Sequence, residues 1–287
     1  MMSLREVLAE AKAKKVALGH FNISELAALK AVVAVAKKLN VPVLIGLSEG
    51  EREFVGVRSA VALTRSLREE LDHPIYLNAD HTHSLEKLEV AVRAGFDEVI
   101  FDVSDKPFEE NLKLTKQAVE MAKSLNPEIV VEGELGWIGS GSEVHERVPE
   151  NLALTDPAEA RQFVAETKID VLAPAVGNMH GMLASMVAGE THKELNIERV
   201  RQLAEATGIF MTLHGGSGTS DESFRAAIEA GMTIVHVSTE LRLAWRRGVE
   251  KALAADAKEL TPYKLLGPAV VDVETVVTNR LKLFNNI

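Results

Sequence analysis

Residues 75–101, IYLNADHTHSLEKLEVAVRAGFDEVIF, decide the fold class because they contain one complete strand–helix–strand unit. The apolar runs near 75–79 and 97–101 predict strands, and the segment between them has the apolar spacing of an amphipathic helix. Ser84 is a suitable N-cap for that helix and Gly95 a suitable end. The unit therefore predicts parallel strands connected by a helix.

The same alternation runs through the whole chain of 287 residues. Strands are expected near 16–20, 42–47, 75–79, 97–101, 128–132, 170–174, 209–213 and 232–237. Eight strand–helix units with strands apolar on both faces predict an α/β protein, a single (β/α)8 TIM barrel over residues 1–287 with a C-terminal helical extension. A doubly wound open sheet is the alternative. Further N-caps are expected at Ser24, Asp156 and Ser220, and further helix ends at Gly208 and Gly231.

Two longer interruptions follow the fifth and sixth predicted strands, at residues 136–155 and 181–195. Connections of this length are uncommon inside a compact barrel unless they serve as lids or binding loops. We therefore expect lids or binding loops at these two places.

Composition bounds the function before any motif is considered. Hydrophobic residues make up 46% of the chain and charged residues 26%, which is typical of a soluble globular protein with a sizeable core. The formal net charge of −10 opposes binding to nucleic acid, and there is no cysteine for disulfide or thiolate chemistry. No stretch has the length of a membrane span, and the start lacks an apolar signal core. We expect a cytoplasmic enzyme with a small-molecule substrate and no nucleic-acid or membrane partner.

Polar residues suited to catalysis stand where the predicted strands end. TIM barrels carry their active sites at the C-terminal ends of the strands, so side chains from different strands can meet there. The residues concerned are Asp80, His81, Asp102, Glu132, Glu134, His180, His214 and the run from His236 to Thr239. Their shared position predicts one site at this end of the barrel.

Three histidines, His81, His180 and His214, end the third, sixth and seventh predicted strands. Three neutral imidazoles with an open position form a catalytic zinc site, which we expect here. The alternative is three unrelated histidines that cap strand ends. Asp80 directly precedes His81, and a carboxylate beside a metal can move a proton. Surface positions or places behind the site are expected for the remaining histidines, His20, His73, His83, His145 and His192.

Acids and glycines extend the predicted site. Asp102 and Glu134 end the fourth and fifth strands, where they are expected either to orient the histidines or to hold a second cation. The loop HGGSGT at 214–219 precedes a helix, and backbone N–H groups freed by glycine suit a phosphate. Ser238 and Thr239 would add hydroxyl donors from the eighth strand.

The motifs GHFNIS, PVLIGLSEG, NADH, VIFDVS, EGELG, GNMHG, LHGGSG and VHVSTE occur in this order over almost the whole chain. With them the chain resembles the class II, metal-dependent fructose-bisphosphate and tagatose-bisphosphate aldolases. The resemblance implies Zn²⁺ as cofactor, with a second divalent or a monovalent cation left open. It also implies a phosphorylated sugar as ligand and assembly into a homodimer or homotetramer.

The resemblance further implies roles for individual residues. Asp80 would be the catalytic proton donor or acceptor, and Glu143, in the loop after the fifth strand, would act on the enediolate carbon. The implied metal ligands are His81, His180 and His214 for zinc, and Asp102 and Glu134 for a second cation in some members. The implied substrate-binding residues are Asn22, Ser48, Gly181, Gly215, Gly216, Ser217, His236, Val237, Ser238 and Thr239.

Four features depart from the family pattern. His236 stands where relatives usually have Asn, and Ser142 stands where they have the loop glutamate, so that Glu143 comes one residue late. The segment after GNMHG is longer than in tagatose-type members and lacks the lysine expected soon after the motif. Thr278, with Arg280 nearby, stands where an arginine for the far phosphate is expected. All four bear on the substrate and not on the metal.

The predicted function is zinc-dependent aldol cleavage or condensation of a ketose bisphosphate, with fructose 1,6-bisphosphate giving dihydroxyacetone phosphate and glyceraldehyde 3-phosphate. Cleavage beside a ketone leaves an enediolate whose charge a Lewis acid stabilises, so no lysine Schiff base is needed. One alternative keeps this mechanism but acts on tagatose 1,6-bisphosphate or a deoxy-keto sugar acid phosphate. The others are a metal-dependent sugar-phosphate isomerase or hydrolase, and a silent sugar-phosphate-binding protein.

Overall fold

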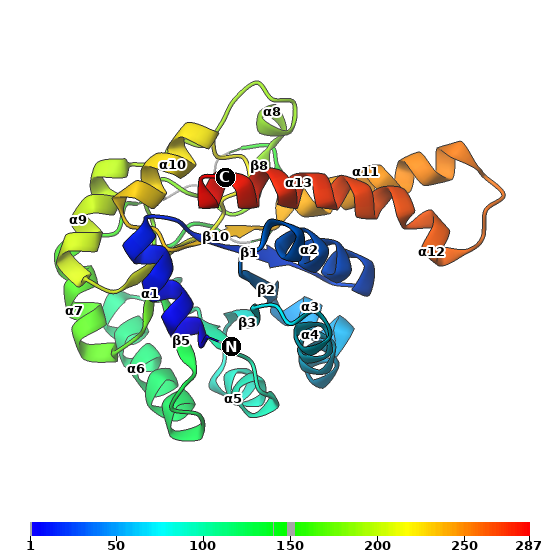
Figure 1. The fold of residues 1–287 in the computed structure, drawn as a ribbon. Coiled ribbons are helices and arrows are strands. Elements are labelled where there is room, and N and C mark those ends of the chain that lie inside the picture. Colours follow the sequence, from blue (N-terminus) through cyan, green and yellow to red (C-terminus); the bar gives the residue numbers. More distant parts are fainter. Residues whose placement is uncertain (1, 140, 148–152) are drawn as a thin grey trace.

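Within residues 2–139, 141–147 and 153–287, which the computed structural model describes, eight parallel strands form a closed barrel. Their order around the barrel is β1-β10-β9-β7-β5-β4-β3-β2 (Figure 1). The strands are β1 Leu18–Asn22, β2 Val43–Leu47, β3 Ile75–Thr82, β4 Glu98–Phe101, β5 Val130–Leu135, β7 Val171–Pro174, β9 Phe210–Leu213 and β10 Ile234–Val237. The predicted TIM barrel is therefore confirmed, and the open sheet is wrong.

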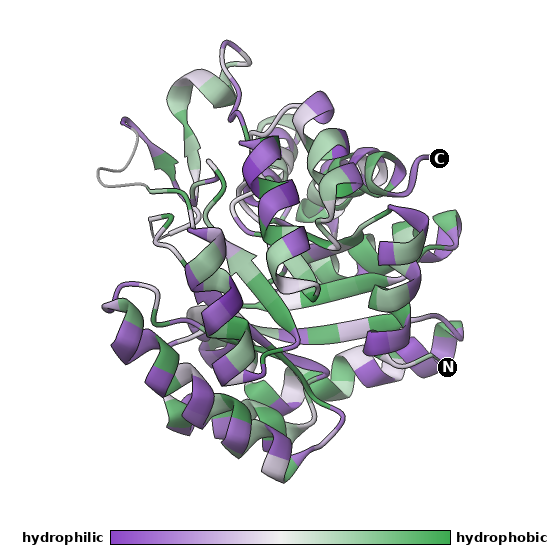
Figure 2. Ribbon diagram, turned by 90° about the vertical axis from the view of Figure 1, so that its left-hand side faces the viewer, coloured by the Kyte–Doolittle hydropathy of each residue, from purple (hydrophilic) through white to green (hydrophobic). Residues whose placement is uncertain are grey.

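Helices follow the strands and surround the barrel. They are α2 Leu26–Leu39, α4 Val57–Leu71, α5 Leu85–Ala94, α6 Phe108–Leu125, α7 Pro157–Thr167, α9 Ile197–Thr207, α10 Asp221–Ala230 and α11 Thr239–Ala255. Figure 2 shows mainly hydrophobic strands inside a shell of helices that also carry hydrophilic residues. The core therefore lies between the strands and the inner faces of the helices.

Helix ends follow the expected signals with one exception. Side chains of Ser84, Asp156 and Ser220 cap α5, α7 and α10, and Gly95, Gly208 and Gly231 end α5, α9 and α10. The N-cap expected at Ser24 is wrong. Glu25 caps α2 instead, because its carboxylate reaches the backbone N–H groups of Ala27 and Ala28.

The N-terminal helix α1, Leu4–Lys14, closes one end of the barrel. Its residues Leu4, Val7 and Leu8 pack against side chains near the beginnings of the strands, such as Leu18 and Leu44. The opposite end, where the strands finish, is left as the mouth of the barrel.

The two long loops carry short elements at that mouth. β6, Val144–His145, and β8, Met182–Leu183, pair as a separate parallel two-stranded sheet, and α8, Ala184–Val187, follows β8. A further short helix, α3 Glu49–Val55, begins two residues after β2. Positions 140 and 148–152 of the first long loop lie outside the described residues.

The C-terminal extension consists of α11, α12 Pro262–Leu265 and α13 Gly267–Asn285. α11 and α13 lie side by side and project from one side of the barrel, with α12 at the outer end (Figure 1). Gly248 permits this close approach, because a Cβ there would lie 2.3 Å from the Cα of Ala269. No helix in the described part of the chain combines the length and apolar character that a membrane crossing requires.

Candidate active site

The imidazoles of His81, His180 and His214 meet at the barrel mouth. Ring centroids lie 4.7 Å apart for His81 and His180, 4.7 Å for His81 and His214, and 5.8 Å for His180 and His214. One nitrogen from each ring and one carboxylate oxygen of Glu134 all lie within 4.8 Å of one another. His81 lies at the end of β3 and His214 directly after β9, whereas His180 lies in the loop six residues after the end of β7 and not at the strand end expected for it. Together they supply a set of ligands that a single cation could bind.

Local backbone geometry places His81. The register of β3 against β4 shifts between Ala79 and Thr82, and His81 at this irregularity has a φ of +39°. Residues with a side chain rarely adopt this left-handed conformation, and strain of this kind is common at functional sites.

Carboxylates fix which nitrogen of His81 and of His214 is available. Asp102 accepts a hydrogen bond from Nδ1 of His81 at 2.8 Å, and Glu132 accepts one from Nε2 of His214 at 2.6 Å. Nε2 of His81 and Nδ1 of His214 are therefore left facing each other, 3.0 Å apart. A carboxylate behind a ligating imidazole is the usual arrangement in metal sites, because it sets the tautomer and the ring orientation.

The electrostatics also favour a cation at this point. Burial by itself lowers the pKa of His81, but Asp80, Asp102 and Glu134 raise it to about 10. Burial lowers the pKa of His214 to about 3 and, together with His81, holds the pKa of His180 well below its usual range. The cluster thus prefers one positive charge among its carboxylates, which a metal ion could provide in place of the proton.

Glu134 provides the direct test of fit. Within the described residues its buried Oε2 has no hydrogen-bond partner, whereas Oε1 accepts from Ser104 Oγ at 3.1 Å. A buried carboxylate oxygen without a partner is costly unless something binds it. Burial, followed by the charge of Asp102, raises the pKa of Glu134 well above its ordinary value. Asp102 itself, engaged with His81, lies beside this ligand set and outside it.

Asp80 lies next to the imidazole cluster and is almost fully buried, with 4% of its surface exposed. Its Oδ2 accepts a hydrogen bond from Asn22 Nδ2 at 2.8 Å. Its Oδ1 has no hydrogen-bond partner in the described part of the chain and lies 3.8 Å from Nε2 of His81 and 3.6 Å from Nδ1 of His236. Although burial raises the pKa of Asp80, His81 and His20 lower it further, so the free oxygen belongs to a carboxylate.

The HGGSGT loop forms a small pocket beside these groups. Gly215 has a φ of +58°, and a Cβ there would lie 2.1 Å from the carbonyl oxygen of Met179, so only glycine permits this approach of two loops. The pocket is lined by Asn22, Asp80, His81, Ser142, His180, Gly181, Gly215, Gly216, Ser217, His236, Ser238 and Thr239. Val237 is the exception in this predicted run, because its side chain is buried in the hydrophobic core.

A larger cleft of about 430 Å³ adjoins this pocket and shares Asn22, Asp80, His81, Ser142 and His180 with it. Ser48, Glu143 and Asp102 also line it, so both the expected loop glutamate and the serine in its place face the same cleft. Arg242 of α11 lines it too and holds Glu51 at 2.8 Å. Arg242 could not be recognised from the sequence, because its position on α11 carries no motif.

His20 was expected at the surface or behind the site, and it lies fully buried behind it. Its ring stacks on that of His236, with centroids 3.4 Å apart and an angle of 4° between the planes. The ring occupies the space over Gly46, where a Cβ would lie 2.0 Å from Cε1 of His20. His236 is therefore fixed between His20 and His214, whose centroid is 4.2 Å from that of His236.

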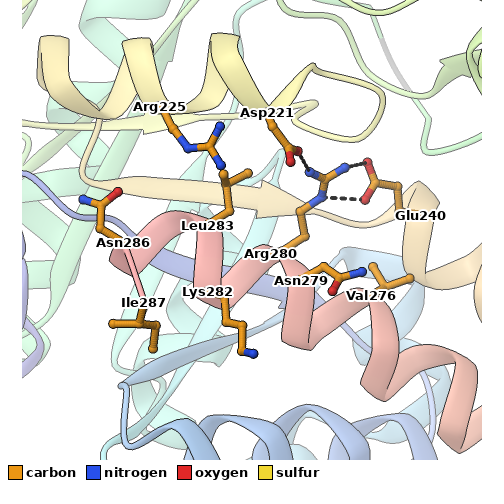
Figure 3. Close-up of a pocket in the computed structure, with 10 residues that line it drawn as sticks. All are labelled: Asp221, Arg225, Glu240, Val276, Asn279, Arg280, Lys282, Leu283, Asn286 and Ile287. Carbon is orange, nitrogen blue, oxygen red and sulfur yellow. Dashed lines mark hydrogen bonds and ion pairs between the residues drawn. The ribbon is translucent and has the colours of Figure 1, made fainter.

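Arg280 does not face the cleft over the histidines in this chain. Its guanidinium binds the carboxylates of Glu240 and Asp221 (Figure 3). It also lies over the ring of Phe224. It lines a separate cavity of about 760 Å³ between α10 and the end of α13. Arg280, the arginine near Thr278, therefore does not take the place of the arginine expected for the far phosphate.

Comparisons with known proteins agree with this geometry. A family model described as "Fructose-bisphosphate aldolase class-II" matches residues 2–287. Fructose-bisphosphate aldolase from Geobacillus stearothermophilus is 34% identical over 289 residues, which cover 100% of this chain and 97% of the relative. The protein of the same name from Staphylococcus aureus (strain Mu50) is 33% identical, covering 99% and 97%. The crystal structure of the YdjI aldolase from Escherichia coli K12 has a TM-score of 0.82 and 28% identity, covering 99% and 97%.

The chain belongs to the class II fructose-bisphosphate aldolase family. It is accordingly an aldolase-type lyase of carbohydrate metabolism, from a family that is generally metal-dependent and acts on phosphorylated sugars.

Proposed function

We propose that this aldolase uses zinc and that its substrate is a ketose bisphosphate, with fructose 1,6-bisphosphate as the first candidate. Cleavage would give dihydroxyacetone phosphate and glyceraldehyde 3-phosphate, and condensation would reverse it. The observation that carries the proposal is the convergence of three imidazole nitrogens and one Glu134 oxygen within 4.8 Å, with the carboxylate of Asp80 beside them.

His81, His180 and His214 would hold the zinc ion, with Glu134 as a further or alternating ligand. Histidine-rich sites with a carboxylate suit zinc better than they suit magnesium or calcium, which prefer oxygen ligands. Bound there, the ion would act as a Lewis acid on the substrate carbonyl. Asp102 and Glu132 would keep His81 and His214 in the ligating tautomer. A second cation near Asp102 and Glu134 remains part of the proposal.

Asp80 would move the proton of the C4 hydroxyl group. Asn22 holds one carboxylate oxygen and leaves the other free to face the pocket. In cleavage the free oxygen accepts the hydroxyl proton as the C3–C4 bond breaks, and in condensation it returns the proton. Glu143, exposed on the loop over the cleft, would exchange the proton at the carbon of the enediolate.

The phosphate of dihydroxyacetone phosphate would bind in the small pocket. Within the residues that the structure describes, the backbone N–H groups of Gly215 and Ser217 have no protein acceptor. Thr239 begins α11, so the positive end of that helix also faces the pocket. Gly181, Gly216 and Ser238 complete the lining, while Ser48 lies farther out in the cleft, where the rest of the sugar would extend.

A second substrate class follows from His236. This side chain lies in the pocket at the place where relatives usually have Asn, fixed by stacking and 3.6 Å from Asp80. A rigid imidazole there would select among sugars that differ near C3 and C4, so tagatose 1,6-bisphosphate or a deoxy-keto sugar acid phosphate is the alternative substrate.

Purified enzyme loaded with zinc tests the proposal. Each of the three candidate sugars is added, and dihydroxyacetone phosphate is measured with a coupled dehydrogenase. We expect release from at least one sugar, loss of activity with a chelator, and recovery with Zn²⁺. Release from none of them would contradict the proposal, and conversion of one phosphosugar into another without C–C cleavage, seen by NMR, would indicate an isomerase.

We also propose that residues 1–287 form one folding unit and that the protein is a cytoplasmic homodimer or homotetramer. The projecting extension supports association, because Leu253, Leu260, Tyr263 and Val271 expose apolar side chains on it. Light scattering after size-exclusion chromatography checks the assembly, and a monomer at working concentrations would contradict it.

A further inference from the structure

The ammonium group of Lys193 lies in a cage of four backbone carbonyl oxygens. Nζ is 2.8 Å from Met179 O, 2.6 Å from Gly181 O, 2.8 Å from Gly215 O and 2.5 Å from Ser217 O. Only 3% of the residue is exposed. Within the described residues no carboxylate forms an ion pair with it, so the carbonyl dipoles, together with the more distant charge of Glu240, compensate the buried charge.

This cage has the chemistry of an alkali-cation site. Converging carbonyl oxygens replace the hydration shell of K⁺ where proteins select it. An ammonium group has only three protons to donate, so it cannot form a separate hydrogen bond to each of the four oxygens. The attraction between its positive charge and the carbonyl dipoles therefore contributes to the contacts as well. Burial lowers the pKa of Lys193 to about 7. The four oxygens favour the charged form, because a neutral amine would turn its lone pair toward one of them.

The four oxygens come from the two loops that build the phosphate pocket. Met179 and Gly181 flank His180, and Gly215 and Ser217 follow His214 in the HGGSGT loop. The backbone of Lys193 is anchored to the same loop, since its N–H donates to Gly218 O at 2.9 Å. The cation therefore ties together the segments that carry two of the three imidazoles and the N–H groups of the pocket.

We propose that Lys193 serves as a built-in monovalent cation of the phosphate pocket and makes this aldolase independent of K⁺ and Na⁺. By holding the carbonyl oxygens on the far side of both loops, Lys193 keeps the N–H groups of Gly215 and Ser217 directed at the phosphate. It also places one positive charge behind an anionic ligand in a protein of net charge −10. Lys193 is a positioning residue in this scheme, and the inference rests on the proposed function in that the ligand is a sugar phosphate.

The test compares cations at constant ionic strength. Zinc-loaded wild-type enzyme is assayed in tetramethylammonium, K⁺ and Na⁺ salts, with the dissociation constant of dihydroxyacetone phosphate measured by calorimetry beside kcat and KM. We expect all three quantities to be the same in the three salts. A wild-type enzyme that requires K⁺ or Na⁺ for binding or turnover would overturn the proposal without any variant.

Lys193→Ala empties the cage and should create a cation requirement. In tetramethylammonium we expect binding of dihydroxyacetone phosphate to weaken about tenfold or more, the loss that follows removal of hydrogen bonds to a charged group. K⁺ or ammonium should restore binding saturably, while zinc content stays unchanged. Lys251→Ala is the matched control, because it removes an exposed ammonium on α11 that pairs with Asp272.

A folded, zinc-containing Lys193→Ala protein that no small cation restores would contradict the inference. If that variant does not fold, Lys193→Val retains part of the packing of the side chain and still leaves the position of Nζ vacant, and its melting temperature should rise with K⁺ but not with tetramethylammonium. This thermal readout needs no substrate. Failure of every sugar phosphate to bind the wild-type enzyme would count against the proposed function, while a melting temperature insensitive to K⁺ would count against the cage.

Discussion

At the scale of single residues, the site depends on a division of labour between neighbouring side chains. Asp80 has one carboxylate oxygen held by Asn22 and one without a partner among the described residues, whereas His81 next to it uses Nδ1 on Asp102 and presents Nε2. One residue can therefore move a proton while its neighbour binds a cation, and the two functions can be separated by substitution.

Asp80→Ala should retain zinc and lose most turnover. Positioned general acids and bases contribute about 10²–10⁴-fold to rate, and kcat should fall by about that factor. Zinc is measured by elemental analysis and kcat by the coupled assay. Full activity in the variant would show that another group moves the proton.

Glu132→Ala should weaken the binding of zinc although it changes none of the proposed ligands. Glu132 accepts from Nε2 of His214 at 2.6 Å and fixes the nitrogen that faces His81. Loss of such a supporting carboxylate costs about 10–100-fold in metal affinity. Competition with a fluorescent zinc chelator measures the change in affinity. An unaltered zinc affinity would contradict the supporting role of Glu132.

The contacts that could not be predicted from the sequence share a physical cause. His20 lies against His236 only because Gly46, on another strand, has no side chain. Lys193 interacts with backbone carbonyls, which leave no residue-specific pattern in the sequence. The histidine ligands could be predicted from the sequence, because histidine is a residue type that suits metal binding and each of the three follows a predicted strand.

At the scale of elements, strands and helices follow local patterns, while the loops depend on distant contacts. Apolar runs predicted all eight barrel strands to within a few residues, because strands buried on both faces must be apolar. The pairing of β6 with β8 could not be predicted, since two residues from each of two loops carry no periodicity. The short helix α8 could not be predicted for the same reason.

Asp170, directly before β7, ties three elements together and gives the fold an acid-sensitive contact. Its carboxylate binds Arg5 of α1, Lys123 of α6 at 2.6 Å and the N–H of Val131 in β5 at 2.9 Å. Burial raises its pKa, but Arg5 and Lys123 lower it more, so the pKa lies below its ordinary value of 3.8. The stabilisation is therefore present above pH 3.8 and is lost as the pH falls through the lower pKa of the folded state.

Asp170→Asn should lower the free energy of unfolding at neutral pH by about 1–2 kcal/mol, because two of the three partners lose a charged acceptor and are partly exposed. Its stability should then depend less on pH in the acid range than that of the wild type. Urea titrations at a series of pH values measure both. Parallel curves for the two proteins would contradict the role of Asp170.

Gly248→Val should loosen the packing of α11 on α13. A Cβ at this position would lie 2.3 Å from Ala269 Cα, and overpacking of this kind costs about 1–3 kcal/mol. The melting temperature reports the effect. Gly267→Ala is the control, because a Cβ there meets no atom within 4 Å and should be tolerated.

At the scale of the whole molecule, barrel closure is what assembles the site. The strands that end at His81 and His214 are not neighbours, since β7, β5 and β4 lie between β9 and β3 in the sheet order. In an open sheet with that order these imidazoles would lie far apart. Closed-barrel geometry could be predicted from the eightfold repeat, and the convergence at one mouth followed from it.

Zinc content and cleavage of fructose 1,6-bisphosphate, measured side by side in the wild type and in His180→Ala, test the central claim most directly. We predict that the wild type binds zinc and releases dihydroxyacetone phosphate, and that the variant loses both the metal and the activity. Activity that survives in the variant, or that a chelator leaves unchanged in the wild type, would contradict the claim that three imidazoles hold the metal on which catalysis depends.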